Sequence, residues 1–174
     1  MSIFNRSFLK IPLLTLSLTI ASLHAGQTSA REPVAVAAPG ATIAASFHAE
    51  GAQVYECKSG SDSELVWQAR EPIATLIRDG KTAGHHYAGP SWEHIDGSAV
   101  RARVVDNAPG ATPYDIPWLK LDVTIRRGVG TLSGVTTVLR INTKGGTTRG
   151  PCDKVGSYLS VPYSADYVFL RRRH

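Results

Sequence analysis

The sequence contains only two cysteines and one methionine among its 174 residues, and aromatic residues make up 7% of it. It has no internal repeat, no phosphate-binding glycine loop and no cysteine pairs at the spacing of a zinc site. Signals for helix starts and stops are nearly absent. These absences argue against repeat proteins, nucleotide-binding α/β enzymes and structural zinc domains, and they favour a fold built of strands.

The first thirty residues have the pattern of a secretory signal. Arg6 and Lys10 precede an apolar run at residues 11–23, and small residues follow at Ala25 and Ala30. We expect a signal peptide at residues 1–25, with cleavage as late as residue 30, and an exported protein that is periplasmic or secreted. The run is too short and too polar for a permanent span of about 20 apolar residues, so no membrane span is expected in the mature protein.

Positive charge is concentrated at the two ends of the chain. Without Arg6 and Lys10 the formal net charge falls from +5 to +3, which equals the contribution of Arg171, Arg172 and Arg173. The body is therefore nearly neutral, and we expect residues 171–174 to form a solvated basic tail. A body without a basic stripe argues against nucleic acid as a partner.

Cys57 and Cys152 form an even pair, and exported proteins usually oxidise such pairs. The sequence predicts one disulfide, which links an early strand to a late segment and thereby indicates a single domain. It closes a loop of about 95 residues, for which chain entropy gives at most about 4–5 kcal/mol of stabilisation.

Apolar and polar residues alternate along much of the chain, as they do in half-buried strands. The clearest case is residues 119–125, and residues 72–78 fit either a short helical turn or an irregular strand. The pattern predicts an all-β fold, a single antiparallel β-sandwich or barrel-like domain at residues 47–170, after an extended lead-in at residues 26–46. The other alternating segments are residues 51–58, 65–70, 100–104, 135–141, 158–163 and 166–170.

The side chains best suited to chemistry gather at residues 84–98, which hold three of the six histidines. Glycines and a proline predict a turn-rich connection between two β segments. Neighbouring strand residues face opposite sides, so His85 and His86 cannot both serve one site. We expect a pocket for a small molecule or a cell-envelope glycan, in a binding or envelope-associated module, lined by His86, Trp92, Glu93, Asp96 and Trp118.

The alternative is a small metal-assisted or acid–base enzyme that uses the same stretch. Imidazole and carboxylate groups suit zinc, copper or iron, and the candidate ligands are His86, Glu93 and His94, with His85 and Asp96 as further options. Their spacing matches no known metal motif, so no cofactor is predicted. No nucleophile elbow is present, and the balance of the sequence is against an enzyme.

Several segments, in order, resemble the family known as domain of unknown function 3455. They are Val-Tyr-Glu-Cys at 54–57, Gly-His-His-Tyr-Ala-Gly-Pro-Ser-Trp-Glu at 84–93, Asp-Gly-Ser at 96–98, Ile-Pro-Trp-Leu at 116–119 and Val-Pro-Tyr-Ser-Ala-Asp-Tyr at 161–167. The resemblance covers roughly residues 40–170 and implies an exported bacterial or fungal protein without an established reaction. Some fungal relatives carry a label resembling malate dehydrogenase, but this chain lacks the dinucleotide-binding fingerprint.

Overall fold

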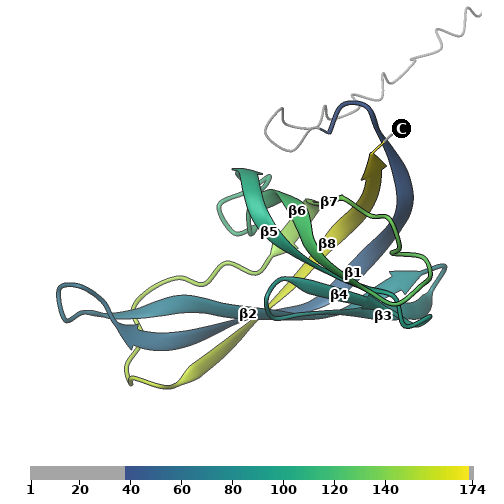
Figure 1. Cartoon of the computed structure of the whole chain (residues 1–174). Coiled ribbons are helices and arrows are strands. Elements are labelled where there is room, and N and C mark those ends of the chain that lie inside the picture. The colour runs from purple at the N-terminus through teal and green to yellow at the C-terminus, as the bar shows by residue number, and fades with distance from the viewer. Residues whose placement is uncertain (1–37, 173–174) are drawn as a thin grey trace, which may run out of the picture. The chain divides into compact units, whose positions relative to one another are not determined.

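The computed structural model describes residues 38–172, which form eight strands and no helix (Figure 1). The expected signal peptide and the start of the lead-in lie outside this range. No helix within it is long and apolar enough to cross a membrane. The strands are β1 (Ala41–Ser59), β2 (Leu65–Arg78), β3 (Lys81–Tyr87), β4 (Ser91–His94), β5 (Ala99–Ala108), β6 (Trp118–Arg127), β7 (Thr137–Gly145) and β8 (Tyr158–Arg172).

The strands form one closed antiparallel barrel. Each strand pairs with the next along the chain, and β8 returns to pair with β1. The described strands belong to one compact unit. The prediction of a single all-β, barrel-like domain is therefore confirmed.

Aromatic residues fill the interior, and alanines on the neighbouring strands make room for them. Phe47, Trp92, Tyr167 and Phe169 are almost completely buried. The ring of Phe169 lies 5.6 Å from that of Phe47 and 6.0 Å from that of Trp92, both edge to face. Such offset contacts add to the stabilisation from burial of the apolar surface.

An arm of three strands extends beyond the barrel (Figure 1). In it, residues 53–59 of β1 pair with residues 65–72 of β2 on one side and with the first residues of β8 on the other. β2 pairs with β3 only from Ala74 onward, so the β2 residues in the arm pair with β1 and have no partner on β3.

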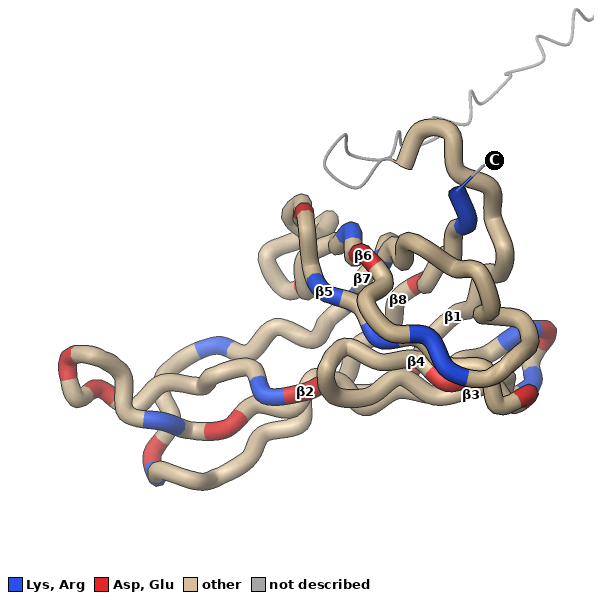
Figure 2. The backbone as a smooth tube through the Cα atoms, viewed as in Figure 1, with Lys and Arg blue, Asp and Glu red and all other residues tan. Residues whose placement is uncertain are grey.

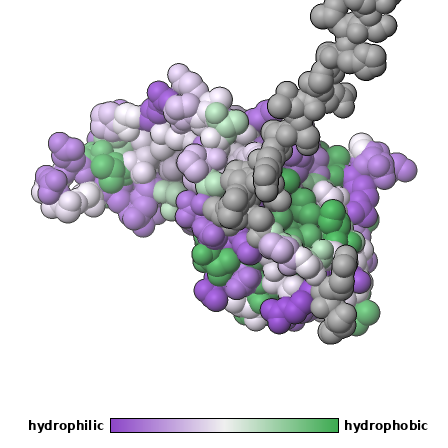
Figure 3. Space-filling view, turned by 90° about the horizontal axis from the view of Figure 1, so that it is seen from above, coloured by the Kyte–Doolittle hydropathy of each residue, from purple (hydrophilic) through white to green (hydrophobic). Residues whose placement is uncertain are grey.

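The surface of the arm differs from that of the barrel. Basic and acidic residues are interspersed along the arm (Figure 2). In the view from above, its visible surface is mostly hydrophilic, whereas larger hydrophobic areas lie over the barrel (Figure 3).

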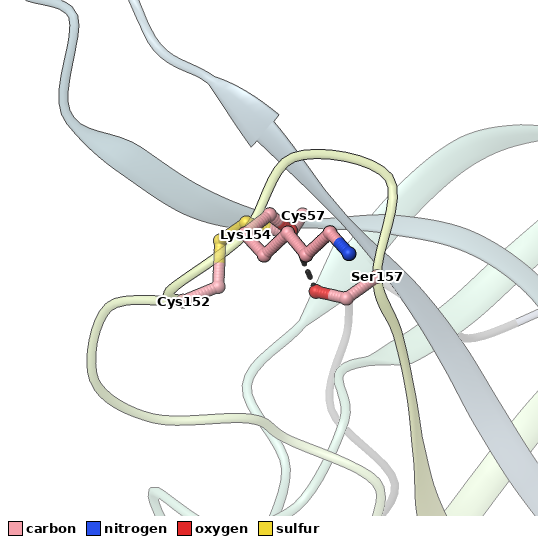
Figure 4. The surroundings of a disulfide bond; sticks show 4 residues. All are labelled: Cys57, Cys152, Lys154 and Ser157. Carbon is pink, nitrogen blue, oxygen red and sulfur yellow. Dashed lines mark hydrogen bonds between the residues drawn. A yellow bond between two sulfur atoms is a disulfide. The ribbon is translucent and has the colours of Figure 1, made fainter.

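The predicted disulfide between Cys57 and Cys152 is present and fastens the loop before β8 to the arm (Figure 4). The two Cα atoms are 5.8 Å apart. Backbone hydrogen bonds reinforce the link, because the amide of Gly156 donates to the carbonyl of Cys57 and the amide of Cys57 donates to the carbonyl of Ser157, each at 2.9 Å.

The strands begin earlier and run longer than the sequence pattern indicated. β1 starts at Ala41 instead of near Phe47, because residues 41–47 pair with the end of β8. Arg171 and Arg172, expected in the tail, lie opposite Thr42 and Ala41. The pairing between β1 and β8 thus places residues in strands although their sequence shows little alternation of apolar and polar residues.

Two segments whose sequence pattern was ambiguous or interrupted are continuous strand. Residues 72–78 are the second half of β2 and contain no helical turn, and the pairing with β3 shifts register between Leu76 and Ile77, which agrees with the alternative of an irregular strand. β8 continues through Pro162, where the sequence indicated a break. Pro162 lies just beyond the β7 ladder, which ends where Gly145 pairs with Tyr163, so the missing amide hydrogen interrupts no ladder bond to β7.

Candidate functional site

Residues 84–98, which hold the histidines singled out from the sequence, belong to a β-hairpin and are not the mainly turn-rich connection that the sequence indicated. It contains β3 and β4, joined by a turn at residues 88–90 and followed by a turn at residues 95–97. His86 pairs with Trp92, and His85 pairs with Glu93. The first pair is buried and the second is exposed. The prediction that the two histidines face opposite sides is confirmed.

His86 is 2% exposed and lies against two aromatic rings in the barrel interior. Its ring stacks on Trp92 with centroids 4.5 Å apart and planes 6° from parallel, and Tyr167 lies 4.8 Å away. The Nδ1 atom lies 2.8 Å from the carbonyl oxygen of Ser91, which can only accept a hydrogen bond. Nδ1 therefore carries the proton.

Burial lowers the pKa of His86 to about 3, because desolvation penalises the charged ring. The hydrogen bond to Ser91 opposes this shift, and the positive charge of Arg140 reinforces it. At neutral pH the imidazole is uncharged, and its Nε2 atom is a hydrogen-bond acceptor.

Trp92 is 1% exposed, and its indole N–H has no hydrogen-bond partner among the described residues. Buried donors in folded proteins nearly always have one, so an unpaired donor needs an explanation. Trp92 also lines a cavity of about 160 Å³ together with His86, Tyr167, Leu119 and Leu121.

The cavity lies where β2 separates from β3. The residues lining it on that side are Arg70 and Pro72 from β2 and Gly89 and Pro90 from the turn between β3 and β4. Arg70 and Gly89 are exposed to solvent. A small molecule can therefore approach from the base of the arm.

Arg140 forms the polar side of the cavity. It is 9% exposed, and its Nε atom donates to the carbonyl of Pro117 at 3.0 Å. Its guanidinium also reaches the Tyr167 hydroxyl. None of the ion pairs among residues 38–172 involves Arg140, so its charge has no carboxylate partner there.

Two tyrosine hydroxyls lie beside this charge. Tyr163 and Tyr167 have hydroxyl oxygens 3.3 Å apart. Burial raises the pKa of both phenols, so they remain protonated and can donate hydrogen bonds.

Of the five residues expected to line a pocket, only His86 and Trp92 share this cavity. Glu93 is exposed on the other side of the hairpin, where the Tyr87 hydroxyl donates to it at 3.3 Å and Arg127 lies 3.8 Å away. Trp118 starts β6 opposite Ala108 and is half-buried outside the cavity lining.

Asp96 has a structural role, because its hydrogen bonds connect the turn after β4 to the loop before β7. Its carboxylate accepts hydrogen bonds from the Ser98 hydroxyl at 2.6 Å, the Ser98 amide at 2.9 Å and the Thr131 amide at 2.7 Å. These bonds, the Ser98 hydroxyl first, hold the pKa of the carboxyl far below its usual range. Asp96 also lies 2.9 Å from the Nδ1 atom of His94, whose ring packs against Phe47.

The candidate metal ligands are not brought together. His86 points into the barrel and Glu93 points out of it, so one ion cannot contact both side chains. His94 is occupied by Asp96 and Phe47. Across residues 38–172 no group of three His, Cys, Asp or Glu side chains has a geometry suited to a metal ion.

The sequence did not point to Arg140, because the alternation in β7 placed it on the solvent side of the strand and the structure places it on the barrel side. The alternation over residues 135–141 predicted a core-facing set of Val135, Thr137, Leu139 and Ile141. Val135 and Leu139 are indeed buried. Within β7, however, Val138 and Arg140 lie opposite the buried rings of Phe169 and Tyr167, and Val138 packs in the main core cluster. An arginine in an alternating strand is normally taken as solvent-exposed, and no pattern in the sequence indicates its burial.

Comparison with protein families gives one match. Residues 37–171 match the family described as a protein of unknown function (DUF3455). No curated protein and no solved structure matches the chain. The family match spans the barrel, the arm and both cysteines, and the chain therefore belongs to the DUF3455 family.

Proposed function

We propose that this domain is a binding module of an exported protein and that it holds a small molecule in the cavity beside His86 and Trp92. The observation that carries the proposal is the buried indole N–H of Trp92, which lacks a partner and belongs to a residue lining a cavity that reaches the surface. A ligand acceptor would satisfy that donor.

The composition of the cavity supports this proposal. Binding sites are concave, mostly apolar and carry a few fixed polar groups. Here Leu119, Leu121 and the stacked rings provide apolar walls, and His86 provides an acceptor whose orientation is fixed by Ser91.

The cavity volume limits the size of the ligand. An engineered protein cavity of about 150 Å³ holds benzene, and this cavity is about 160 Å³. The proposed ligand is thus about the size of one ring. A cell-envelope glycan could place at most one such unit inside.

The disulfide supports the location in this proposal. Disulfides persist in oxidising compartments outside the cytoplasm, and Cys57–Cys152 joins the arm to the loop before β8. Together with the signal pattern, this bond favours a periplasmic or secreted protein.

The test is a titration of the mature chain with benzyl alcohol, benzamide and benzoate, followed by NMR of the tryptophan indole N–H signals. Occupation of the cavity shifts the Trp92 signal, which is identified by its loss in Trp92→Phe. Leu119→Phe narrows the cavity and reduces the shift. Ile125→Phe on the same strand, at a half-exposed position, is the control and leaves the shift unchanged. If none of the three probes shifts the Trp92 signal, the proposal is wrong.

A further inference from the structure

We propose that the ligand is a small carboxylate with a flat apolar body, and that Arg140 binds its carboxylate group. This inference rests on the proposed function, since it names the ligand class for the same cavity. Arg140 is a charged residue buried inside the barrel.

A buried guanidinium without a counter-ion is unfavourable, because its charge loses hydration and gains no ionic partner. Arg140 is in this position: it is 9% exposed, and within residues 38–172 its hydrogen-bond acceptors are the Pro117 carbonyl and the Tyr167 hydroxyl. Neither acceptor carries a charge. A ligand anion would provide the missing partner.

The rest of the lining adds positive charge and no negative charge. Two arginines, Arg70 and Arg140, line the cavity, and no aspartate or glutamate does. Arg70 lies on the solvent side, where Glu71 pairs with it at 3.1 Å and Tyr158 lies below its guanidinium. The inner charge, on Arg140, is the uncompensated one.

The donors near Arg140 suit a carboxylate. Guanidinium has five N–H groups in a planar fork, and a carboxylate can accept two of them side by side. Tyr167, whose hydroxyl is protonated, and Trp92, whose indole N–H has no partner, line the same cavity. A single carboxylate can accept several such bonds at once.

The remaining walls define the other end of the ligand. Leu119, Leu121, Pro72 and Pro90 are apolar, and the indole of Trp92 offers a flat surface. The cavity of about 160 Å³ leaves room for one ring. These features together favour a ring-sized monocarboxylate over an inorganic anion, which would leave the apolar walls without contacts.

The experiment compares benzoate with benzamide, which has the same ring and a neutral head group, by calorimetric titration of the mature chain. We expect benzoate to bind about 10- to 100-fold more tightly, the range for a hydrogen bond to a charged group. Arg140→Gln should abolish this preference. Arg103→Gln, at a side chain 67% exposed, is the matched control and should retain it.

The outcomes separate this inference from the proposed function. If benzamide binds as tightly as benzoate, or if Arg140→Gln keeps the preference, the carboxylate inference is wrong while a small-molecule site remains. If no ring-sized probe binds, both are wrong. The comparison of the two probes in the unaltered chain needs no variant, so the inference stays testable even if Arg140→Gln does not fold.

Discussion

His86 lies between Trp92 and Tyr167 in the barrel interior, where burial lowers its pKa to about 3. In the unfolded chain its pKa returns to about 6.5. The unfolded state therefore binds a proton as the pH falls below about 6.5, while the folded state does not. Stability is lost from about pH 6.5 down to about pH 3, by at most roughly 1.4 kcal/mol per pH unit.

This loss can be measured by urea unfolding at pH 7, 6, 5 and 4. His86→Phe keeps an aromatic ring beside Trp92 and removes the titrating group, so its stability should fall less steeply with acid than that of the unaltered chain. His85→Phe, at the exposed neighbour, is the control and should keep the full slope. Equal slopes in all three proteins would show that His86 does not carry this effect.

Single residues also mark the limit of sequence reasoning about the site. His86 and Trp92 could be chosen from the sequence because reactive residue types cluster around them. Arg140 could not, because strand alternation places charge outside and only the closure of the barrel turns that face inward. Glu93 was included for its proximity in sequence, although its direction on the strand takes it to the other side.

At the scale of elements, the close approach of β1 and β2 depends on Gly51. It pairs with Ala74, and a side chain at this position would collide with the backbone carbonyl of Ile73. Gly51→Ala should therefore destabilise the protein by about 1–3 kcal/mol or more. The measurement is urea unfolding, with Gly60→Ala as the control, because a Cβ there meets its nearest atom at 3.4 Å. Equal costs for the two variants would contradict this account of Gly51.

The arm and the loop before β8 are joined by the disulfide, so its loss should affect both. Replacing Cys57 and Cys152 by serine should lower the free energy of unfolding by about 2–4 kcal/mol. It should also speed trypsin cleavage after Arg149 and Lys154 in the native state, since both exposed residues flank Cys152 in a loop that becomes more mobile without the bond. Faster cleavage can be followed by mass spectrometry of the fragments. An unchanged cleavage rate would mean that the backbone bonds alone hold the loop.

Element boundaries were predictable only where the strand pattern is strong. Residues 119–125 alternate clearly and lie in β6. The alanine-rich residues 41–46 show no such pattern, and their order comes from pairing with β8, more than a hundred residues later. Long-range pairing of this kind leaves no local trace in the sequence.

At the scale of the whole molecule, closure of the barrel makes the strands depend on one another. β1 contacts both β2 and β8, and its residues run through the barrel and the arm. We therefore expect barrel and arm to unfold in one transition. In a chain that also carries Trp118→Phe, fluorescence of Trp67→Phe reports on Trp92 in the barrel, and fluorescence of Trp92→Phe reports on Trp67 in the arm. In urea unfolding of each variant, we expect the fluorescence midpoint to coincide with the midpoint measured by circular dichroism. A Trp67 fluorescence midpoint at lower urea than the circular-dichroism midpoint would show that the arm unfolds separately.

The fold class, the disulfide and the family follow from the sequence, because alternation, cysteine number and ordered motifs are global signals. The cavity does not, since it arises from the separation of β2 from β3 at Ala74 and from the inward face of β7. Both are properties of the closed sheet.

The most direct test of the account is a crystal structure of the mature chain grown with benzoate. We predict the benzoate ring in the cavity against Trp92, with its carboxylate on the guanidinium of Arg140. A cavity that holds only water, or that is closed by side chains while benzoate binds elsewhere, would contradict the central claim that this barrel is built around a ligand site.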